Sequence, residues 1–419
     1  MKVLKFINKH KNAIYALCII TIIAIVSLII YYCVESSNSE HFGSDKLFVC
    51  DKKFCSEKFK ELRCLFPIFY KLYFSQDMNI PNKNVKPNTK INKIFVSVAS
   101  YRDDQCLETI KSMIERADHP ENLVICVCQQ NSILEKDCFQ DCNKSIKTDS
   151  FNKSCPSAKI ERLAYTSARG PTWARWRLQR KWDGEEYYLQ IDAHMRFVKS
   201  WDTLLKDQLS LCPSNKPVLT QYPLEYTINK KTKASKTSKE KDLEKDEEWQ
   251  VDKMRNGLYV QKFNNPDGFY RIQSDFTEER RSQPFSATCW AAGFSFSRAD
   301  FFWDVGYDPY TPFLFFGEEM DIAIRGWTHG YDFFSPSENI VFHNYKREHR
   351  KTFWENPFQS PLEVLSRFRI YVRLGYIKPD DIPKKYKFIL KNIEKFPMGN
   401  KRSIEDYEKF SGLELPKFV

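Results

Sequence analysis

The chain has 419 residues, of which 42% are hydrophobic and 15% aromatic, and its formal net charge is +11. This composition excludes an intrinsically disordered chain and allows one large domain or two medium ones. The positive excess lies at the two ends: four lysines precede residue 12, and residues 346–419 contain 17 basic against 10 acidic residues. A partner with phosphates fits this charge, and a nucleotide satisfies it as well as DNA or RNA does.

The N-terminal part contains an apolar stretch, residues 13–34 ("AIYALCIITIIAIVSLIIYYCV"), which has no charged residue. As a helix it would be about 33 Å long, enough to cross a bilayer. Lysines precede it, and Glu35 and Glu40 follow it. This asymmetry predicts a cytoplasmic tail at 1–12 and a luminal remainder, as in a single-pass type II membrane protein of the Golgi or secretory pathway. A cleaved signal peptide is disfavoured, because the stretch is too long and lacks a small-residue cleavage site.

The chain contains 13 cysteines, and the 11 that lie outside the apolar stretch fit an oxidising compartment. Because 11 is odd, at least one of these thiols is expected to be free or intermolecular. The chain has no pair of CxxC motifs, so structural zinc is disfavoured. The connectivity of any disulfides stays open.

The next part of the chain is predicted to be a stem followed by a βαβ unit. Residues 35–92 form the stem, and the turn-rich stretch 81–90 serves as its linker. Buried strands are expected at 93–100 ("KIFVSVAS") and at 122–128 ("NLVICVC"). Between them, the apolar residues from Leu107 to Ala117 recur with helical spacing. Strand, helix and strand within about 35 residues predict a parallel sheet.

Two segments are expected to be surface loops. The triplet "NKS" occurs at Asn143 and Asn152, which gives two potential N-glycan acceptors in a loop-like stretch. The mixed-charge run Lys230–Glu248 is expected to be solvated.

The first predicted strand ends at "SYRD", Ser100–Asp103. In parallel sheets, ligands bind beyond the carboxyl ends of the strands, so these four residues are candidate ligand contacts. The alternative is that Asp103 or Asp104 only caps the following helix.

A basic and aromatic segment follows at Ala168–Trp182 ("ARGPTWARWRLQRKW"). Gly170 and Pro171 interrupt the chain, so a helix is expected from about Thr172. Arginine forks bind phosphate and stack on aromatic rings, which favours a phosphate contact. The alternative is a solvated basic helix face.

A further strand, Tyr187–Ile191, ends in an acid and an imidazole ("YYLQIDAHMRF"). If the extended geometry persists, Asp192 and His194 point to the same side. A carboxylate and an imidazole suit a divalent ion such as manganese, whose missing ligands the substrate would supply. An ordinary loop start is the alternative.

Three acids, Glu318, Glu319 and Asp321, follow an aromatic run and precede a predicted helix. Carboxylates beside aromatic rings are suited to binding a sugar. The alternative is that the acids complement the dipole of a helix N-terminus. The aromatic residues themselves are more often core than ligand platform.

The segment "NIVFHNYKREHR" places His343 after a short apolar strand and before a basic cluster. His343 is a candidate third metal ligand, and the basic cluster would lie beside phosphate. The alternative is a structural histidine.

Taken in order along the chain, five motifs resemble those of one enzyme family. They are "FVSVASYRD", "ARGPTWAR", "GEEYYLQIDAHMRFVKSWD", "PFLFFGEEMDIAIRGWTHGYDFFSP" and "HNYKR". They are similar to motifs of the protein α-N-acetylglucosaminyltransferases of glycosyltransferase family 60. That family adds GlcNAc from UDP-GlcNAc to hydroxyproline or threonine of proteins. The polypeptide GalNAc-transferases are similar more distantly.

The resemblance implies an α/β fold of the GT-A type over residues 93–350, with a Rossmann-like mixed sheet that binds the nucleotide. Residues 351–419 would be a C-terminal helical extension. The implied activity retains the anomeric configuration and uses Mn²⁺ or another divalent cation. The implied partners are a UDP-sugar and a protein or peptide acceptor. Some family members are cytoplasmic and modify hydroxyproline, whereas the predicted anchor points to mucin-like threonine acceptors.

The resemblance also implies roles for individual residues. Asp192 and His194 correspond to a DxD-like metal pair, and His343 to a late metal ligand; Asp192 would also contact the nucleotide-sugar. The residues expected near the nucleotide or its diphosphate are Ser100, Tyr101, Arg102, Asp103, Arg169 and Arg175. The residues expected to face the donor sugar are Glu318, Glu319 and Asp321. Same-face attack by the acceptor hydroxyl is favoured over a nucleophilic Glu318.

Other functions are less well supported by the residues. A membrane-anchored, lectin-like protein without transferase activity could lose the metal ligands, yet all three are present. The predicted anchor argues against a nucleic-acid partner. A zincin-type protease is disfavoured because the chain has no HExxH motif.

Overall fold

The computed structural model describes residues 92–139, 156–228, 247–249, 254–255, 257–260, 267–277, 279, 281–346, 352–353 and 360–415. The predicted anchor, nearly all of the predicted stem and the two potential glycan acceptors lie outside these residues. Among the helices of the described residues, none is both long and apolar enough to cross a membrane.

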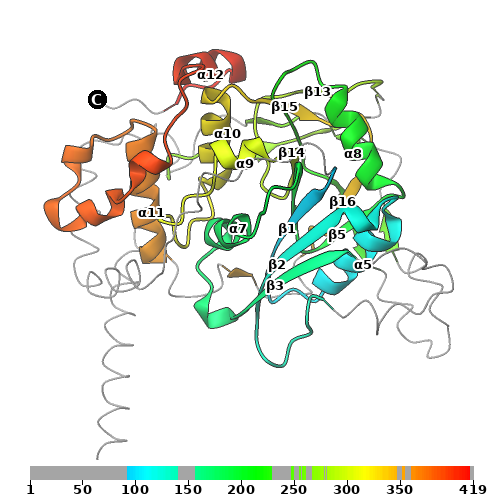
Figure 1. Ribbon diagram of the computed structural model, residues 1–419. Coiled ribbons are helices and arrows are strands. Elements are labelled where there is room, and N and C mark those ends of the chain that lie inside the picture. The colour runs from blue at the N-terminus through cyan, green and yellow to red at the C-terminus, as the bar shows by residue number, and fades with distance from the viewer. Residues whose placement is uncertain are drawn as a thin grey trace, which may run out of the picture.

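A mixed sheet of eight strands forms the centre of the α/β fold (Figure 1). In spatial order its strands are β13 (Phe285–Ala287), β15 (Asp332–Ser335), β6 (Pro217–Thr220), β14 (Phe294–Arg298), β4 (Tyr187–Asp192), β1 (Ile94–Tyr101), β2 (Leu123–Asn131) and β3 (Ser157–Ala164). Strands β4, β1, β2 and β3 run parallel, and β14 runs antiparallel to both of its neighbours. The parallel arrangement brings the carboxyl ends of β4, β1 and β2 to one edge.

The predicted βαβ unit is confirmed. Helix α5 (Cys106–Arg116) connects β1 to β2, and it buries Leu107, Ile110 and Ile114 as the helical spacing predicts. Strand β2 continues to Asn131, three residues beyond the predicted end. The extension matters because it carries Gln130 to the same edge of the sheet as the end of β1.

Helices cover both faces of the sheet, because the strands direct apolar side chains toward each face. Helices α5 and α8 (Trp201–Ser210) share one hydrophobic cluster with Val96 and Ile125. The opposite cluster includes Phe95 and Val124. The helices that contribute to it are α7 (Pro171–Gln179), α9 (Asp300–Asp304) and α10 (Glu318–Thr328). Strands that are apolar on both faces are typical of parallel sheets.

A second sheet brings a late segment of the chain to the tip of β4. Its order is β5 (Met195–Phe197), β16 (Val341–His343), β7 (Leu224–Ile228) and β8 (Glu247–Trp249). Strand β16 pairs with β5, so that His343 lies opposite Met195, directly after the Asp192–His194 turn. Strand β8 corrects the prediction of a loop at 230–248 in part, since Glu247 and Glu248 pair with β7. Residues 230–246 lie outside the described residues.

The described residues also include four two-residue strands. They are β9 (Met254–Arg255), which pairs with β12 (Phe276–Thr277), and β10 (Tyr259–Val260), which pairs with β11 (Ile272–Gln273).

The C-terminal segment packs against α10 rather than standing apart from it (Figure 1). Helices α11 (Ser360–Arg373) and α12 (Ile404–Ser411) contribute Phe368 and Tyr407 to the cluster that holds α10. Ion pairs from α11 reach α10, as described below. The C-terminal segment therefore supports the helix that carries the acidic motif.

Six cysteines of the described residues are free thiols, and all six are buried: Cys106, Cys126, Cys128, Cys138, Cys212 and Cys289. The other seven lie outside the described residues.

Candidate active site

A cavity of about 390 Å³ opens at the carboxyl ends of β1, β2 and β4. Its walls combine acidic, basic and aromatic side chains. From β1 and its end come Tyr101 and Asp103, and from β2 comes Gln130. The strand-end rule that selected the "SYRD" residues therefore located the correct edge of the sheet.

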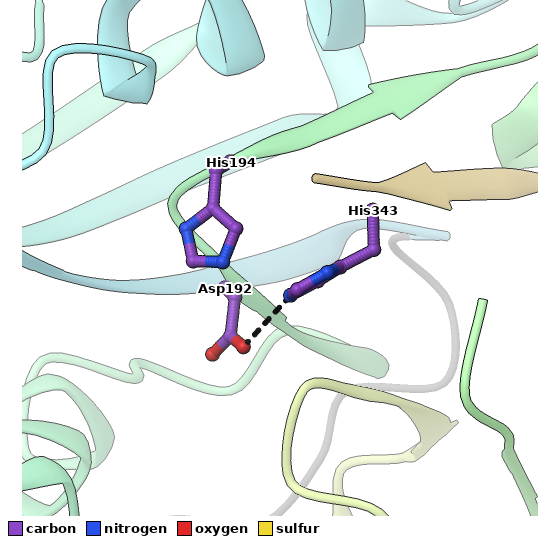
Figure 2. Close-up of side chains that lie close together, drawn as sticks. All are labelled: Asp192, His194 and His343. Carbon is purple, nitrogen blue, oxygen red and sulfur yellow. Dashed lines mark hydrogen bonds and ion pairs between the residues drawn. The ribbon is translucent and has the colours of Figure 1, made fainter. Parts of the chain in front are cut away.

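Three potential metal ligands meet in this cavity (Figure 2). One ligand atom from each of Asp192, His194 and His343 lies within 4.8 Å of the other two. The two imidazole rings meet edge to face with their centroids 4.4 Å apart. The sequence predicted this trio although His343 follows Asp192 by about 150 residues, and the structure confirms that the three side chains converge.

The carboxylate of Asp192 is held in its ionised form. Burial alone would raise the pKa of Asp192, but the hydrogen bond with His343 and the charge of Arg175 hold it well below its ordinary value. His343 Nε2 lies 3.4 Å from Asp192 Oδ2. An ionised carboxylate beside two imidazoles is the donor set that a divalent cation such as manganese accepts, so these residues fit the predicted metal.

Asp103 holds the ring of His194. Its Oδ2 accepts a hydrogen bond from His194 Nδ1 at 2.8 Å, since a carboxylate can only accept. Asp103 Oδ1 also accepts from the N–H of Gln105, the N-cap residue of α5, at 2.9 Å, so Asp103 contacts the start of the helix as well as His194. With Nδ1 engaged by Asp103, Nε2 is the nitrogen oriented to bind a metal, as in carboxylate–histidine–metal arrangements.

Arg175 joins the metal ligands to the acidic motif. Its Nη2 donates to Asp192 Oδ1 at 2.8 Å and its Nη1 to Glu318 Oε1 at 2.5 Å. Burial lowers the pKa of Arg175, but the charge of Glu318, with a smaller contribution from Asp192, raises it above its usual value. The alternative of a solvated basic face is therefore wrong for Arg175, whereas Arg177 of the same helix and Arg180, its C-cap residue, are partly exposed.

The two glutamates of the acidic motif have different surroundings. Oε1 of Glu318 also accepts a hydrogen bond from the hydroxyl of Tyr307 at 2.8 Å. Glu319 accepts from the Ala292 N–H at 2.9 Å and from the Tyr222 hydroxyl at 3.3 Å. Burial raises the pKa of Glu319 to about 7, against the Ala292 hydrogen bond that lowers it. Glu318 is thus paired with the guanidinium of Arg175, whereas Glu319 can carry a proton near neutral pH.

Three residues predicted to lie near the nucleotide are not among the described residues that line the cavity. Ser100 faces α5 instead, because successive residues of β1 point to opposite sides of the sheet. Arg102 pairs with Glu135 at 2.7 Å, beside the cavity. Arg169 stacks over Trp173, with 5.8 Å between the guanidinium carbon and the ring centroid.

Asp321 also lies away from the cavity lining, in a buried ion network. Both of its carboxylate oxygens accept from Arg373 of α11 at 2.7 Å. Arg373 also pairs with Asp308, whose Oδ2 lies 2.6 Å from Arg369 Nε. Asp321 therefore has a structural role instead of the predicted contact with a sugar, because both of its carboxylate oxygens bind Arg373 within the core.

The sequence did not single out several residues that line the cavity. Gln130 follows the apolar part of β2, so the strand-end rule could have identified it. Tyr222, Tyr345 and Phe353 carried no distinctive local signal. Gly293 approaches the metal ligands closely: a Cβ at this position would lie 3.1 Å from Asp192 Oδ2. A side chain at this position would therefore crowd the carboxylate, which would have to shift by a few tenths of an ångström.

Many solved structures are similar to this chain, and they include the following three. GalNAc-T7 with UDP, GalNAc and Mn²⁺ is 14% identical, with a TM-score of 0.46 over 90% of this chain and 65% of that chain. The mannosyltransferase PcManGT from Pyrobaculum calidifontis in complex with GDP-Man and Mn²⁺ is 11% identical, with a TM-score of 0.34 over 82% of this chain and 86% of that chain. S. aureus TarS 1–349 in complex with UDP-GlcNAc is 13% identical, with a TM-score of 0.39 over 72% of this chain and 73% of that chain. The chain spans about 65% of the length of the GalNAc-T7 chain. No curated protein sequence matches the chain.

The comparison with protein families covers most of the chain. The model described as Glycosyltransferase (GlcNAc) matches residues 93–165 and 141–417. This match contains β1, the Asp192–His194 turn, the acidic motif of α10 and His343. The chain belongs to the Glycosyltransferase (GlcNAc) family.

Proposed function

We propose that the chain is a retaining, metal-dependent glycosyltransferase of the GT-A type. It moves N-acetylglucosamine from UDP-GlcNAc to a hydroxyl of a protein acceptor, either threonine or hydroxyproline. The observation that carries the proposal is the meeting of Asp192, His194 and His343 with Glu318 and Glu319 around one cavity. Membership of the GlcNAc transferase family supports the choice of sugar.

Asp192, His194 and His343 would hold manganese or another divalent cation. One carboxylate and two imidazoles are too few ligands for a closed site, which suits a cation that also binds diphosphate oxygens. When bound, the cation stabilises the negative charge that develops on the β-phosphate as its bond to the sugar breaks.

The protein groups then position the reactants. Tyr101 and Asp103 line the cavity and would contact the nucleotide, and Glu319, which also lines it, would be a hydrogen-bond partner for sugar hydroxyls. The acceptor hydroxyl attacks the anomeric carbon from the face that UDP leaves, and the leaving phosphate takes the hydroxyl proton. A nucleophilic Glu318 is disfavoured, because its Oε1 already accepts hydrogen bonds from Arg175 and Tyr307.

The test is incubation of the full-length chain with a panel of UDP-sugars, Mn²⁺, and threonine- or hydroxyproline-containing peptides. We expect transfer from UDP-GlcNAc, an α-linked product by NMR, and loss of transfer and of UDP-GlcNAc hydrolysis in a folded Asp192→Ala variant. Binding of sugar without turnover would instead favour a lectin-like protein. Unchanged turnover of Asp192→Ala in manganese would contradict the metal assignment.

We also propose that residues 13–34 anchor the chain in a membrane of the secretory pathway, with the catalytic part in the lumen. The apolar stretch and the lysines that precede it support this proposal. In sealed microsomes, added protease should then remove only the short N-terminal tail. Complete digestion of the catalytic part without detergent would contradict the orientation.

A further inference from the structure

Tyr307 lies outside the motif that contains the three acids, yet its side chain reaches one of them. It belongs to the loop between α9 and α10 and is 2% exposed. Its hydroxyl donates to Glu318 Oε1 at 2.8 Å. Burial, together with the charge of Glu318, raises the pKa of Tyr307 well above its ordinary value. The hydroxyl therefore keeps its proton and remains a donor to the carboxylate.

The loop that carries Tyr307 is held by two helices. The Tyr307 N–H donates to Gln179 Oε1 of α7 at 2.9 Å. The next residue, Asp308, accepts at Oδ2 from Arg369 Nε of α11 at 2.6 Å, within the buried ion network described above. Because α7 and α11 both bind this loop, the Tyr307 hydroxyl has a fixed place relative to α10.

Two donors converge on one oxygen of Glu318. Arg175 Nη1 and the Tyr307 hydroxyl both donate to Oε1. Among the hydrogen bonds of the described residues, none reaches Glu318 Oε2, and Glu318 lines the cavity. A carboxylate oxygen is a hydrogen-bond acceptor with two lone pairs. Oε2 can therefore accept a hydrogen bond from a ligand.

The neighbouring Glu319 uses its oxygens differently. Its Oε1 accepts from the Ala292 N–H at 2.9 Å, and its Oε2 accepts from the Tyr222 hydroxyl at 3.3 Å. Each oxygen of Glu319 thus has a protein partner. Of the two glutamates that line the cavity, Glu318 is the one that has an oxygen left for a substrate within the part of the chain that the structure describes.

We propose that Tyr307 is a positioning residue for the donor sugar, which orients Glu318 so that Oε2 accepts a hydrogen bond from a sugar hydroxyl. This inference rests on the proposed function. Arg175 offsets the charge of Glu318, and the second donor restricts rotation of the carboxylate. A carboxylate that is already oriented loses less conformational freedom when the sugar binds. Tyr307 acts through Glu318, since it is not among the described residues that line the cavity.

The experiment measures the dissociation constants of UDP-GlcNAc and of UDP for the full-length chain in the presence of Mn²⁺. Tyr307→Phe removes the hydroxyl and keeps the ring, which stacks on Phe302 with 16° between the ring planes. We expect UDP-GlcNAc to bind about 3- to 10-fold more weakly to this variant, because one hydrogen bond to a charged group is lost while Arg175 remains. UDP should bind equally to both proteins, because it lacks the sugar.

Tyr331→Phe is the matched control. Tyr331 is also buried, and its hydroxyl donates to a carboxylate, Asp304 Oδ2, at 2.8 Å. It is not among the described residues that line the cavity. This variant should leave the affinity for UDP-GlcNAc unchanged.

A double-mutant cycle separates positioning from a general effect on the fold. In a Glu318→Gln background, Tyr307→Phe should cause little further loss of UDP-GlcNAc affinity, because Tyr307 acts through the Glu318 carboxylate. An equal loss in both backgrounds would overturn the proposal, and so would an unchanged affinity in the single variant. Donor sugar found covalently attached to Glu318 by mass spectrometry would also overturn it, because Oε2 would then be a nucleophile.

Failure of the proposed function would look different. An unchanged chain that binds UDP-GlcNAc but transfers sugar to none of the peptides would contradict the transferase proposal alone. The affinities of the unchanged chain and of Tyr307→Phe would still decide the role of Tyr307. An unchanged chain that does not bind UDP-GlcNAc would overturn both proposals.

Discussion

Replacement of Asp103 by asparagine should weaken metal binding while the fold is retained. The carboxylate is buried, 4% exposed, and accepts from His194 Nδ1 at 2.8 Å. A hydrogen bond to a charged group contributes about 1.5–3 kcal/mol and a neutral one about 1 kcal/mol. The substitution keeps an acceptor for Nδ1 but removes the charge, so it should cost about 1–2 kcal/mol. That corresponds to a fall in metal affinity of roughly 5- to 30-fold.

The assay is the Mn²⁺ concentration that gives half-maximal UDP-GlcNAc hydrolysis, together with Mn²⁺ binding measured by electron paramagnetic resonance in the presence of UDP. Asp104→Asn is the matched control, because Asp104 is exposed and contacts only its neighbour Gln105 among the hydrogen bonds of the described residues. Asp104→Asn should leave the Mn²⁺ dependence unchanged. An Asp103→Asn variant with the same Mn²⁺ dependence as the unchanged chain would refute the reasoning.

Three further predictions follow from contacts around the cavity. The pKa of Glu319 is raised from 4.5 to about 7, so between these pH values the folded protein binds more protons than the unfolded one, and its stability should fall as pH rises. Glu319→Gln should flatten the pH dependence of Tm in this interval. An unchanged slope would contradict the raised pKa of Glu319. Gly293→Ala places a Cβ 3.1 Å from Asp192 Oδ2 and should lower activity more than Tm, which parallel kinetic and melting measurements would show. Arg373→Ala leaves Asp321 buried without its main partner and should cost about 3–5 kcal/mol in urea unfolding, whereas a loss below about 1 kcal/mol would contradict the buried network.

The part of the fold around β1, β2 and β4 could be predicted because local signals agree there. The bounds of these elements were predicted to within a few residues. The signals were runs of β-branched residues, an apolar helical face and a strand that ends at Asp192. The start of α7 was close as well: the helix begins at Pro171, one residue before the expected position. The order of strands in the sheet was beyond local patterns, because β14 and β6 join it through pairings distant in sequence.

The candidate site was predicted best where a residue type has few structural uses. Asp192 and His194 at a strand tip, with His343 later in the chain, converge as expected. Residue type alone could not separate neighbouring polar residues such as Ser100 and Tyr101. Successive side chains of a strand point to opposite sides, so only one of these two residues can point into the cavity. The sequence does not show which side of β1 is covered by α5.

Ionic residues were the hardest to assign, since a carboxylate that binds a ligand and one that binds a buried arginine look alike in sequence. Glu318 and Asp321 lie one turn apart on α10, yet the first reaches the cavity and the second reaches α11. The partner that decides this is Arg373, about 50 residues further along the chain. The long-range packing of the C-terminal segment, rather than the local motif, therefore selects which acid is available to a substrate.

The position of Arg175 connects these observations. It was expected to bind phosphate, but its Nη1 and Nη2 donate to Glu318 and Asp192. In the proposed enzyme it is therefore a positioning residue, which fixes the distance between the metal ligands and the acid expected beside the sugar. Asp103, Asp192 and Glu318 are three acids around Arg175, and Arg271, the other arginine among the described residues that line the cavity, is paired with Asp267 at 2.6 Å. A diphosphate would be repelled by this excess, whereas a divalent cation at Asp192 would offset it, so the donor should bind together with the cation or after it.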